Sequence, residues 1–283
     1  MSDAATSPGP APTAPAPSPL ATSEPWDLVA DAYTKESLSY FLAYAREALV
    51  HVPVVAGARV LDVACGPGTL SLLAAAAGAR VSALDFSEPM IAQLRDRAAA
   101  AGLTDAIDVR EGDGQRLPFE PATFDAAFSM FGLMFFPDRA AGLRELVRVL
   151  EPGCPALVSS WVPFNGPFGA LFAAARELLP GLPFGGGGGP PLGTPEEIRG
   201  EMTAAGFTTV TVETVVHPLT MPSFEEFWDM MVRTNAPLVL IQHRVGPARW
   251  AEVAPAIKER VRQTVGDGPL VVGRGAYFGI GRT

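Results

Sequence analysis

Short apolar runs alternate with longer amphipathic stretches through the first half of the chain. The apolar runs are bounded by Gly, Pro or Asp and are typical of buried strands: residues 59–63, 79–84, 107–111, 124–130 and 155–161. Helical spacing of apolar residues fills the intervals at residues 69–77, 87–101 and 138–150. This alternation predicts an α/β fold with a parallel sheet and right-handed crossovers.

The flanking regions follow other patterns. Residues 26–50 carry Tyr33, Tyr40 and Tyr44 at helical spacing and predict one or two helices that end before Pro53. After residue 161 we expect helices at 168–179, after the cap residue Thr194, at 223–235 and at 247–265. We also expect strands at 207–216 and 270–278, and a mobile glycine-rich loop at 185–191.

Composition limits the kind of protein this is. The chain has 283 residues, 48% of them hydrophobic, which is enough for one domain with embellishments. Its net charge is −9, and it has no run of basic residues longer than two, so we expect no nucleic-acid partner. The two cysteines indicate a reducing compartment, and no stretch is apolar enough to span a membrane. These features predict a cytoplasmic protein.

The first 25 residues contain seven prolines and six alanines and predict a disordered tail. We divide the rest into N-terminal lid helices (26–57), a core (58–161), and a C-terminal part (162–283). The C-terminal part completes the sheet and adds a helical lid at about 162–193 and 217–268.

The run from Arg59 to Leu70 carries the main chemical signal. It reads as a strand that breaks into a turn with Gly66 and Gly68, where the backbone can pass close to a ligand. Asp85 ends the next predicted strand, where a carboxylate can accept hydrogen bonds from both hydroxyls of a ribose. These features predict a site for a cofactor that contains a nucleoside.

The choice of nucleoside depends on two departures from the dinucleotide fingerprint. Ser71 stands where that fingerprint has its third glycine, and Asp62 lies inside the first strand, where it would repel a pyrophosphate. A nicotinamide-dependent oxidoreductase is therefore disfavoured. An acid at Asp62 suits a cationic amino acid moiety.

With these features the chain resembles the class I S-adenosylmethionine-dependent methyltransferases over roughly residues 26–161. The resemblance rests on the 59–70 run and Asp85, and on residues 112–119, 124–130 and 148–153. More narrowly, it is similar to the small-molecule branch that includes the ubiquinone and menaquinone biosynthesis methyltransferases. Cys154 departs from that branch, which usually has a second glycine there.

The resemblance implies a Rossmann-like sheet of seven strands with the last one antiparallel, and S-adenosyl-L-methionine as the cofactor. It places Asp62 near the methionine amino group, Asp85 on the ribose and Asp113 on the adenine. The complete set of expected cofactor residues is Tyr33, Asp62, Ala64, Cys65, Gly66, Gly68, Asp85, Phe86, Met90, Gly112, Asp113, Gly114, Ser129, Met130 and Phe131. For Phe86 and Met90, packing of a helix on the sheet is an equal alternative.

The acceptor site is expected in the lid. Its aromatic and Met residues imply an apolar pocket, although most such residues belong to ordinary core: Met134, Phe164, Phe168, Trp228 and Met231. His217 and His243 are the candidates for a catalytic contact with the acceptor. No spacing typical of metal ligands is present.

These observations predict a methyltransferase acting by in-line displacement on a small, largely apolar acceptor such as a secondary metabolite or an aromatic or prenyl-like compound. The alternative is an enzyme that binds the same cofactor without methylating, such as a cyclase or decarboxylase. The sequence leaves the acceptor atom, the presence of a general base and the oligomeric state open.

Overall fold

The five apolar runs form the parallel part of a sheet in the computed structural model, which describes residues 18–164, 166–179 and 191–283. The strands are β1 (Arg59–Val63), β2 (Arg80–Asp85), β3 (Ile107–Glu111), β4 (Ala126–Ser129) and β5 (Pro155–Trp161). After its first residue β1 is buried throughout, and β4 is buried along its whole length. Burial on both faces explains why these strands read as continuous apolar runs.

The strand order confirms the predicted fold class. The sheet has seven strands in the order β3-β2-β1-β4-β5-β7-β6. Strand β7 (Leu270–Arg282) runs antiparallel to both of its neighbours, β5 and β6 (Thr208–Met221). The order reverses between β1 and β4, and ligands of such sheets bind beyond the carboxyl ends of the strands at this point.

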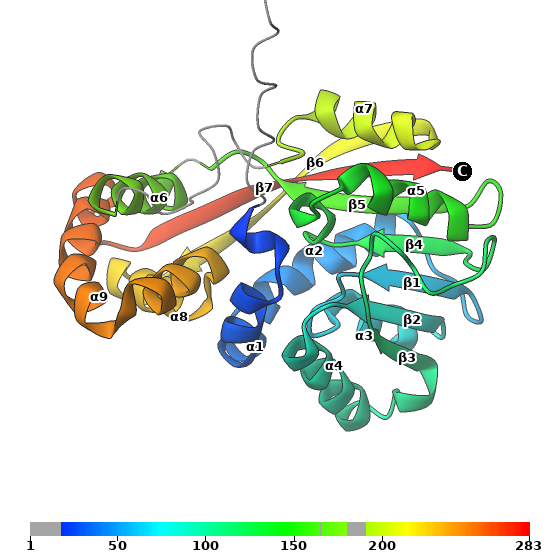
Figure 1. The fold of residues 1–283 in the computed structure, drawn as a ribbon, viewed down its shortest axis with the longest axis horizontal. Coiled ribbons are helices and arrows are strands. Elements are labelled where there is room, and N and C mark those ends of the chain that lie inside the picture. Colours follow the sequence, from blue (N-terminus) through cyan, green and yellow to red (C-terminus); the bar gives the residue numbers. More distant parts are fainter. Residues whose placement is uncertain (1–17, 165, 180–190) are drawn as a thin grey trace, which may run out of the picture.

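Helices cover the sheet (Figure 1). They are α2 (Leu38–His51), α3 (Thr69–Ala76), α4 (Glu88–Ala100), α5 (Arg139–Val149) and α7 (Pro195–Ala205), with 3-10 turns η2 (Thr104–Ala106) and η3 (Leu133–Phe135). Ser87 caps α4 and Thr194 caps α7, each through its hydroxyl, as expected from the sequence.

The last two strands are longer than predicted, and β4 is shorter. The pairing of β6 with β7 continues through Pro218 to Met221, which pairs with Leu270. The predicted strand ended at residue 216, but β6 lies at the edge of the sheet, where Pro218, a residue without an N–H, is tolerated. Strand β4 stops at Ser129, and Phe131 has a left-handed φ of 60°.

Three helices form a separate group at the far end of the long β6–β7 pair (Figure 1). We call α6 (Gly166–Leu178), α8 (Phe224–Thr234) and α9 (Ala236–Val265) the lid. Gly246, with φ 77°, breaks α9, so the helix predicted from residue 247 is preceded by a helical segment that the sequence analysis missed. The lid has its own hydrophobic cluster, which includes Phe227 and Ile257.

The N-terminal helix α1 (Glu24–Glu36) connects the lid with the core, since it contacts α4 as well as α8 and α9. Most of the tail predicted at 1–25 lies outside the described residues. Its last part does not behave as a tail: Pro19–Ala21 forms the 3-10 turn η1, and the Leu20 carbonyl accepts a hydrogen bond from Trp26 Nε1 at 3.1 Å.

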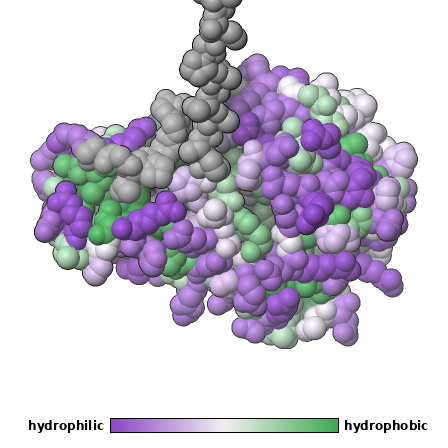
Figure 2. All heavy atoms as spheres, in the orientation of Figure 1, coloured by the Kyte–Doolittle hydropathy of each residue, from purple (hydrophilic) through white to green (hydrophobic). Residues whose placement is uncertain are grey.

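The glycine-rich loop predicted at 185–191 falls, except for Pro191, outside the described residues. In the part of the chain that is described, no helix combines the length and apolar character needed to cross a bilayer. Figure 2 shows apolar surface over the lid end of the molecule, set among hydrophilic residues.

Candidate active site

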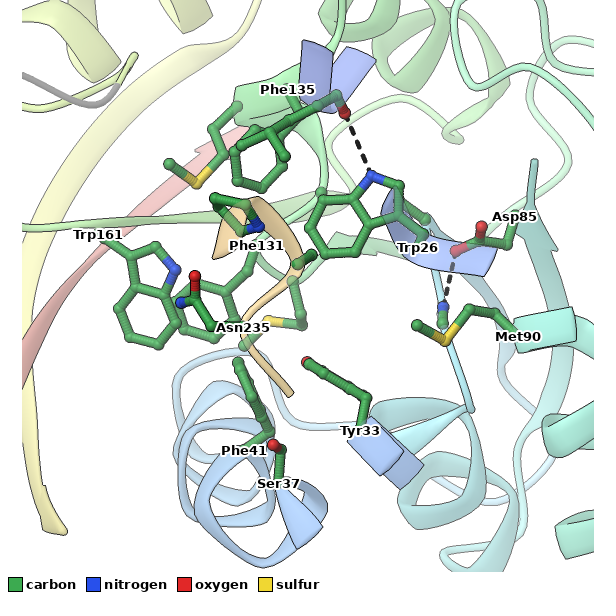
Figure 3. Close-up of a pocket in the computed structure, with 18 of the residues that line it drawn as sticks. Trp26, Tyr33, Ser37, Phe41, Asp85, Met90, Phe131, Phe135, Trp161 and Asn235 are labelled. Carbon is green, nitrogen blue, oxygen red and sulfur yellow. Dashed lines mark hydrogen bonds between the residues drawn. The ribbon is translucent and has the colours of Figure 1, made fainter. Parts of the chain in front are cut away.

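A large continuous cavity extends from the carboxyl ends of the central strands to the lid, with a volume of about 1170 Å³. Pockets for one small ligand measure roughly 300–1,000 Å³, so this cavity has room for more than one. Figure 3 shows Asp85 and Met90 at one end of the drawn pocket and Trp161 and Asn235 at the other, with Tyr33 and Phe41 along one side.

Asp62 lines the cavity from the end of β1. It is almost fully buried, and its Oδ2 accepts a hydrogen bond of 2.6 Å from the Ser71 hydroxyl on α3. Burial disfavours the carboxylate and raises the pKa of Asp62 to about 7, because the Ser71 hydrogen bond offsets only part of the lost hydration. This carboxyl therefore titrates close to neutral pH.

The turn after β1 brings backbone to the cavity. Ala64 and Gly66 both have left-handed φ values, 57° and 54°. A Cβ added at Gly66 would meet no protein atom within 4 Å, so the open space beside it is a cradle that a side chain would fill. Gly68 has a different role, because a Cβ there would lie 2.1 Å from Leu94 Cδ1 of α4. Gly66 is thus shaped for a ligand and Gly68 for helix packing.

Asp85 ends β2 and ties the turn to the start of α4. Its two oxygens accept hydrogen bonds from Gly66 N at 2.8 Å and Ser87 N at 3.0 Å. A carboxylate can accept about four hydrogen bonds, so acceptor capacity is left for a ligand in the cavity. Burial raises the pKa of Asp85 to about 6, although these backbone N–H groups oppose the shift.

Asp27 connects α1 with this carboxylate. The Ser87 hydroxyl donates a 2.6 Å hydrogen bond to Asp27 Oδ1, while the Ser87 N–H donates to Asp85. Ser87 is fully buried and also caps α4. Any ligand that engages Asp85 therefore contacts a group whose geometry depends on α1.

Asp113 lies beyond β3 and lines the cavity with its neighbours Gly112 and Gly114. Its Oδ1 accepts hydrogen bonds from the backbone N and the side-chain Nε2 of Gln115, both at 2.9 Å. Gln115 fixes the orientation of this carboxylate, and the backbone N–H of Asp138 is held by Gln115 Oε1. The third acid of the site is thus presented at a defined angle.

Phe131 marks the boundary between the two ends of the cavity. Its N–H donates to Ser159 Oγ at 2.9 Å, and its ring stacks on Trp161 with 3.9 Å between the ring centroids. A non-glycine residue at positive φ is strained by about 1–3 kcal/mol, so the surrounding contacts hold this ring where it is. Phe41 of α2 packs edge-on against Phe131 at 5.6 Å.

The structure gathers most of the residues predicted from the sequence. Thirteen of the fifteen expected cofactor residues line the cavity, and the exceptions are Gly68 and Ser129. Ser129 Oγ instead accepts a hydrogen bond from the Leu133 N–H. Of the expected acceptor residues, Met134, Phe164, Phe168 and Met231 line the cavity and Trp228 does not. Trp228 stacks on Trp250 inside the lid.

Neither candidate histidine is in the cavity lining. His217 lies on β6 beneath α2, where its ring packs edge-on against Tyr44 at 4.7 Å and its Nε2 is 3.5 Å from Glu47 Oε2. His243 is exposed on α9. Position after a strand or within the lid gave no information about which way either side chain points, and the structure corrects both assignments.

Several lining residues were missed by sequence reasoning: Ser18–Ala21, Trp26, Ser37, Phe41, Arg176, Asn235 and Arg244. Most come from the helices before β1 and from the lid. The aromatic content of 26–50 was the available signal, but helical spacing does not tell which residues face a ligand and which face the sheet.

Cys65 is not suited to nucleophilic chemistry. It is buried in the turn after β1, and burial together with the nearby acids Asp85 and Asp62 raises the pKa of its thiol well above the usual value. Among the described residues, no cluster of three or more His, Cys, Asp or Glu side chains could hold a metal ion.

Comparison with known proteins now adds to the geometry. Residues 60–153 match the family model described as a methyltransferase domain. Demethylmenaquinone methyltransferase of Clavibacter sepedonicus is 45% identical over 102 residues, which are 36% of this chain and 40% of that protein. Residues 60–153 are a class I methyltransferase domain. The resemblance found in the sequence, to the S-adenosylmethionine-dependent methyltransferases, is confirmed.

Another relative has no stated activity, and its coverage limits what can be said about the whole chain. An uncharacterized protein of Mycobacterium tuberculosis is 42% identical over 126 residues, 44% of this chain and 45% of that protein. The chain thus spans about half the length of the curated relatives it matches.

Solved structures share the fold around the methyltransferase domain. The crystal structure of the cyclase SpnF aligns with a TM-score of 0.63 at 21% identity and covers 94% of this chain and 98% of its own. Phosphoethanolamine N-methyltransferase 2 of Haemonchus contortus, in complex with S-adenosyl-L-methionine, aligns with a TM-score of 0.51 at 19% identity. That alignment covers 82% of this chain and 50% of the other. At these identities the likeness establishes the fold.

Proposed function

We propose that this protein binds S-adenosyl-L-methionine and transfers its methyl group to a small, largely apolar acceptor. The observation that carries the proposal is one continuous cavity with three acids at the strand ends and aromatic rings toward the lid. The methyltransferase domain supports the reaction type, and the aromatic lining supports the character of the acceptor.

The residues at the strand ends fit the cofactor. Asp62 offers a buried carboxyl to a cationic amino group, and Asp85 offers spare acceptor capacity to ribose hydroxyls. Asp113 can accept from the adenine amino group. The open space at Gly66 lets the ligand approach the backbone closely. Phe86 and Met90 line the same end and supply apolar surface for a base.

When bound, the cofactor supplies a methyl group on a cationic sulfur, which leaves as neutral S-adenosylhomocysteine while the acceptor gains the new bond and loses a proton to solvent. The chain's own task is orientation and exclusion of water. Phe131, Trp161 and Phe41 form a packed aromatic wall at the junction of the two ends. Orientation alone can supply roughly 7–11 kcal/mol of a barrier.

No histidine or lysine lines the cavity among the described residues. Orientation is therefore proposed as the main source of the rate enhancement. The acceptor's proton then passes to water or to a group close to the acceptor. His217 and His243 have no part in the proposed step.

The test is calorimetric titration of S-adenosyl-L-methionine into the wild-type chain and Asp85→Asn. The variant loses charge-assisted hydrogen bonds worth on the order of 1.5–3 kcal/mol each, so we expect Kd to rise more than about tenfold. Asp108→Asn, an exposed acid on β3, is the matched control and should bind like wild type. Equal affinity in all three proteins, at unchanged melting temperature, would remove the cofactor assignment.

Product analysis then separates transfer from mere binding. Labelled S-adenosyl-L-methionine incubated with a metabolite pool should yield S-adenosylhomocysteine and a labelled apolar product. A product of cyclisation or decarboxylation without S-adenosylhomocysteine would favour the non-methylating alternative. Binding of NAD in place of S-adenosyl-L-methionine would favour an oxidoreductase.

A further inference from the structure

The lining of the cavity changes along α6 from apolar to charged. Three phenylalanines, Phe164, Phe168 and Phe172, follow at intervals of four residues along α6 and its approach, and all line the cavity. The ring centroids of Phe168 and Phe172 lie 6.3 Å and 5.1 Å from that of Phe164. Residues four apart share one face of a helix, so they form a continuous apolar ridge. The next position on this ridge is Arg176, which also lines the cavity.

Arg176 differs from the other charged residues around the cavity. Glu36 is paired with Arg233, Arg244 with Glu24, and Arg139 with Glu201. The acids of the cofactor end have hydrogen-bond donors as described above. Arg176 has no ion pair or hydrogen bond with the residues that the structure describes. The neighbouring segment 180–190 contains no acidic residue that could pair with it.

The arginine lies at the end of the ridge farthest from the cofactor. The ring of Trp161 stacks on Phe131 beside the strand ends. α6 begins shortly after Trp161 and belongs to the group of lid helices that lies away from the parallel strands (Figure 1). From Phe168 to Arg176 a helix rises roughly 12 Å. A ligand that reaches from the aromatic wall to the guanidinium is therefore elongated.

We propose that the acceptor is an elongated amphiphile whose apolar body lies along the phenylalanine ridge and whose anionic end binds Arg176. This inference rests on the proposed function for the identity of the reacting end, but the anion site is a property of the lid alone. Arginine suits carboxylate and phosphate alike because its planar guanidinium can donate two parallel hydrogen bonds. Because Arg176 is exposed, an anionic group bound to it remains partly hydrated.

The experiment measures binding of three probes of equal chain length to the full chain by calorimetry, below their micellar concentrations: dodecanoate, dodecyl phosphate and dodecan-1-ol. At least one anion should bind more tightly than the alcohol. Arg176→Gln should weaken that anion about fivefold or more, as expected for a partly exposed charge pair with a hydrogen bond, and leave the alcohol within about twofold. Arg199→Gln, an exposed arginine on α7 outside the cavity lining, is the matched control.

Phe172→Ala should weaken all three probes, because it shortens the ridge without touching the charge. Tighter binding of dodecanoate than of dodecyl phosphate would identify a carboxylate, and the reverse order a phosphate. The inference is overturned if the alcohol binds as tightly as both anions, or if Arg176→Gln and Arg199→Gln behave alike. Anion binding in a chain that fails to bind S-adenosyl-L-methionine would leave this site standing and remove the proposed function.

Discussion

Two buried carboxyls at the strand ends make the site sensitive to pH. The pKa of Asp62 is raised to about 7 and that of Asp85 to about 6 by burial. In the folded chain without ligand both groups hold their protons to higher pH than in the unfolded chain. Their contribution to stability is therefore full below the unfolded pKa near 4 and is lost as pH rises through 6 and 7.

Ligand binding should have the opposite dependence. A cationic amino group favours ionised Asp62, so we expect affinity for S-adenosyl-L-methionine to rise about tenfold or more between pH 5.5 and 7.5. Calorimetry in buffers of different ionisation enthalpy should show protons released on binding. Asp62→Asn should bind more weakly and with a flatter profile, and its melting temperature should exceed that of wild type more at pH 8 than at pH 5. A wild-type affinity independent of pH would contradict this account.

Individual residues also show how far the sequence could be interpreted. Asp62, Gly66 and Asp85 were predicted because strand ends meet at one edge of a parallel sheet, which local spacing is enough to locate. The stack of Phe131 on Trp161 was not predicted, because it joins the ends of β4 and β5 and depends on a strained φ at Phe131. Trp228 was misplaced since its helix is apolar on more than the side that faces the cavity: Met231 lines the cavity, whereas Trp228 packs within the lid.

At the scale of elements, the segment before β1 covers the cofactor end. Ser18–Ala21 line the cavity, and the Trp26 indole both donates to the Leu20 carbonyl and packs against Phe135 at 5.2 Å. The predicted boundary of the tail at residue 25 thus cuts through part of the candidate site. Proline and alanine content alone does not separate a solvated tail from a short turn held by a tryptophan.

Two truncations should divide this region. Removing residues 1–17 should leave the melting temperature and the affinity for S-adenosyl-L-methionine unchanged, because the Pro- and Ala-rich composition of that stretch predicts a tail. Removing residues 1–22 takes away the turn that lines the cavity and should raise Kd severalfold. Both values come from the same calorimetric titration. Equal affinity of the two truncated chains would show that the turn makes no contact with the ligand.

At the scale of the whole molecule, the described residues form three hydrophobic clusters, of which a small one joins α1, α4 and α9 and the other two hold most of the buried residues. The larger contains Leu61 and Phe128 of the central strands, and the lid cluster contains Phe227 and Ile257. Separate clusters predict separate units of local unfolding, with the lid opening at a lower free energy than the sheet. We therefore expect the lid to open for acceptor entry while the proposed cofactor end remains folded.

Hydrogen exchange monitored by mass spectrometry should detect the two units. Trp228→Ala removes a buried ring from the lid and should speed amide exchange in α8 and α9, with exchange in β1 and β2 unchanged. Leu146→Ala in α5, buried in the larger cluster, is the matched control and should act mainly on the sheet. If Trp228→Ala accelerates both regions equally, the molecule unfolds as one unit.

The pairing of Met221 with Leu270 has a consequence for where the chain can be changed. The chain leaves the sheet at Met221 and returns at Leu270. Residues 222–269 are therefore an insertion between two paired strand ends. Length and sequence can change there without altering the register of any strand. The donor end of the sheet can thus stay constant while the acceptor end is exchanged, and a graft meant to redirect the acceptor end has to carry α6 as well as residues 222–269, because α6, α8 and α9 share one hydrophobic cluster.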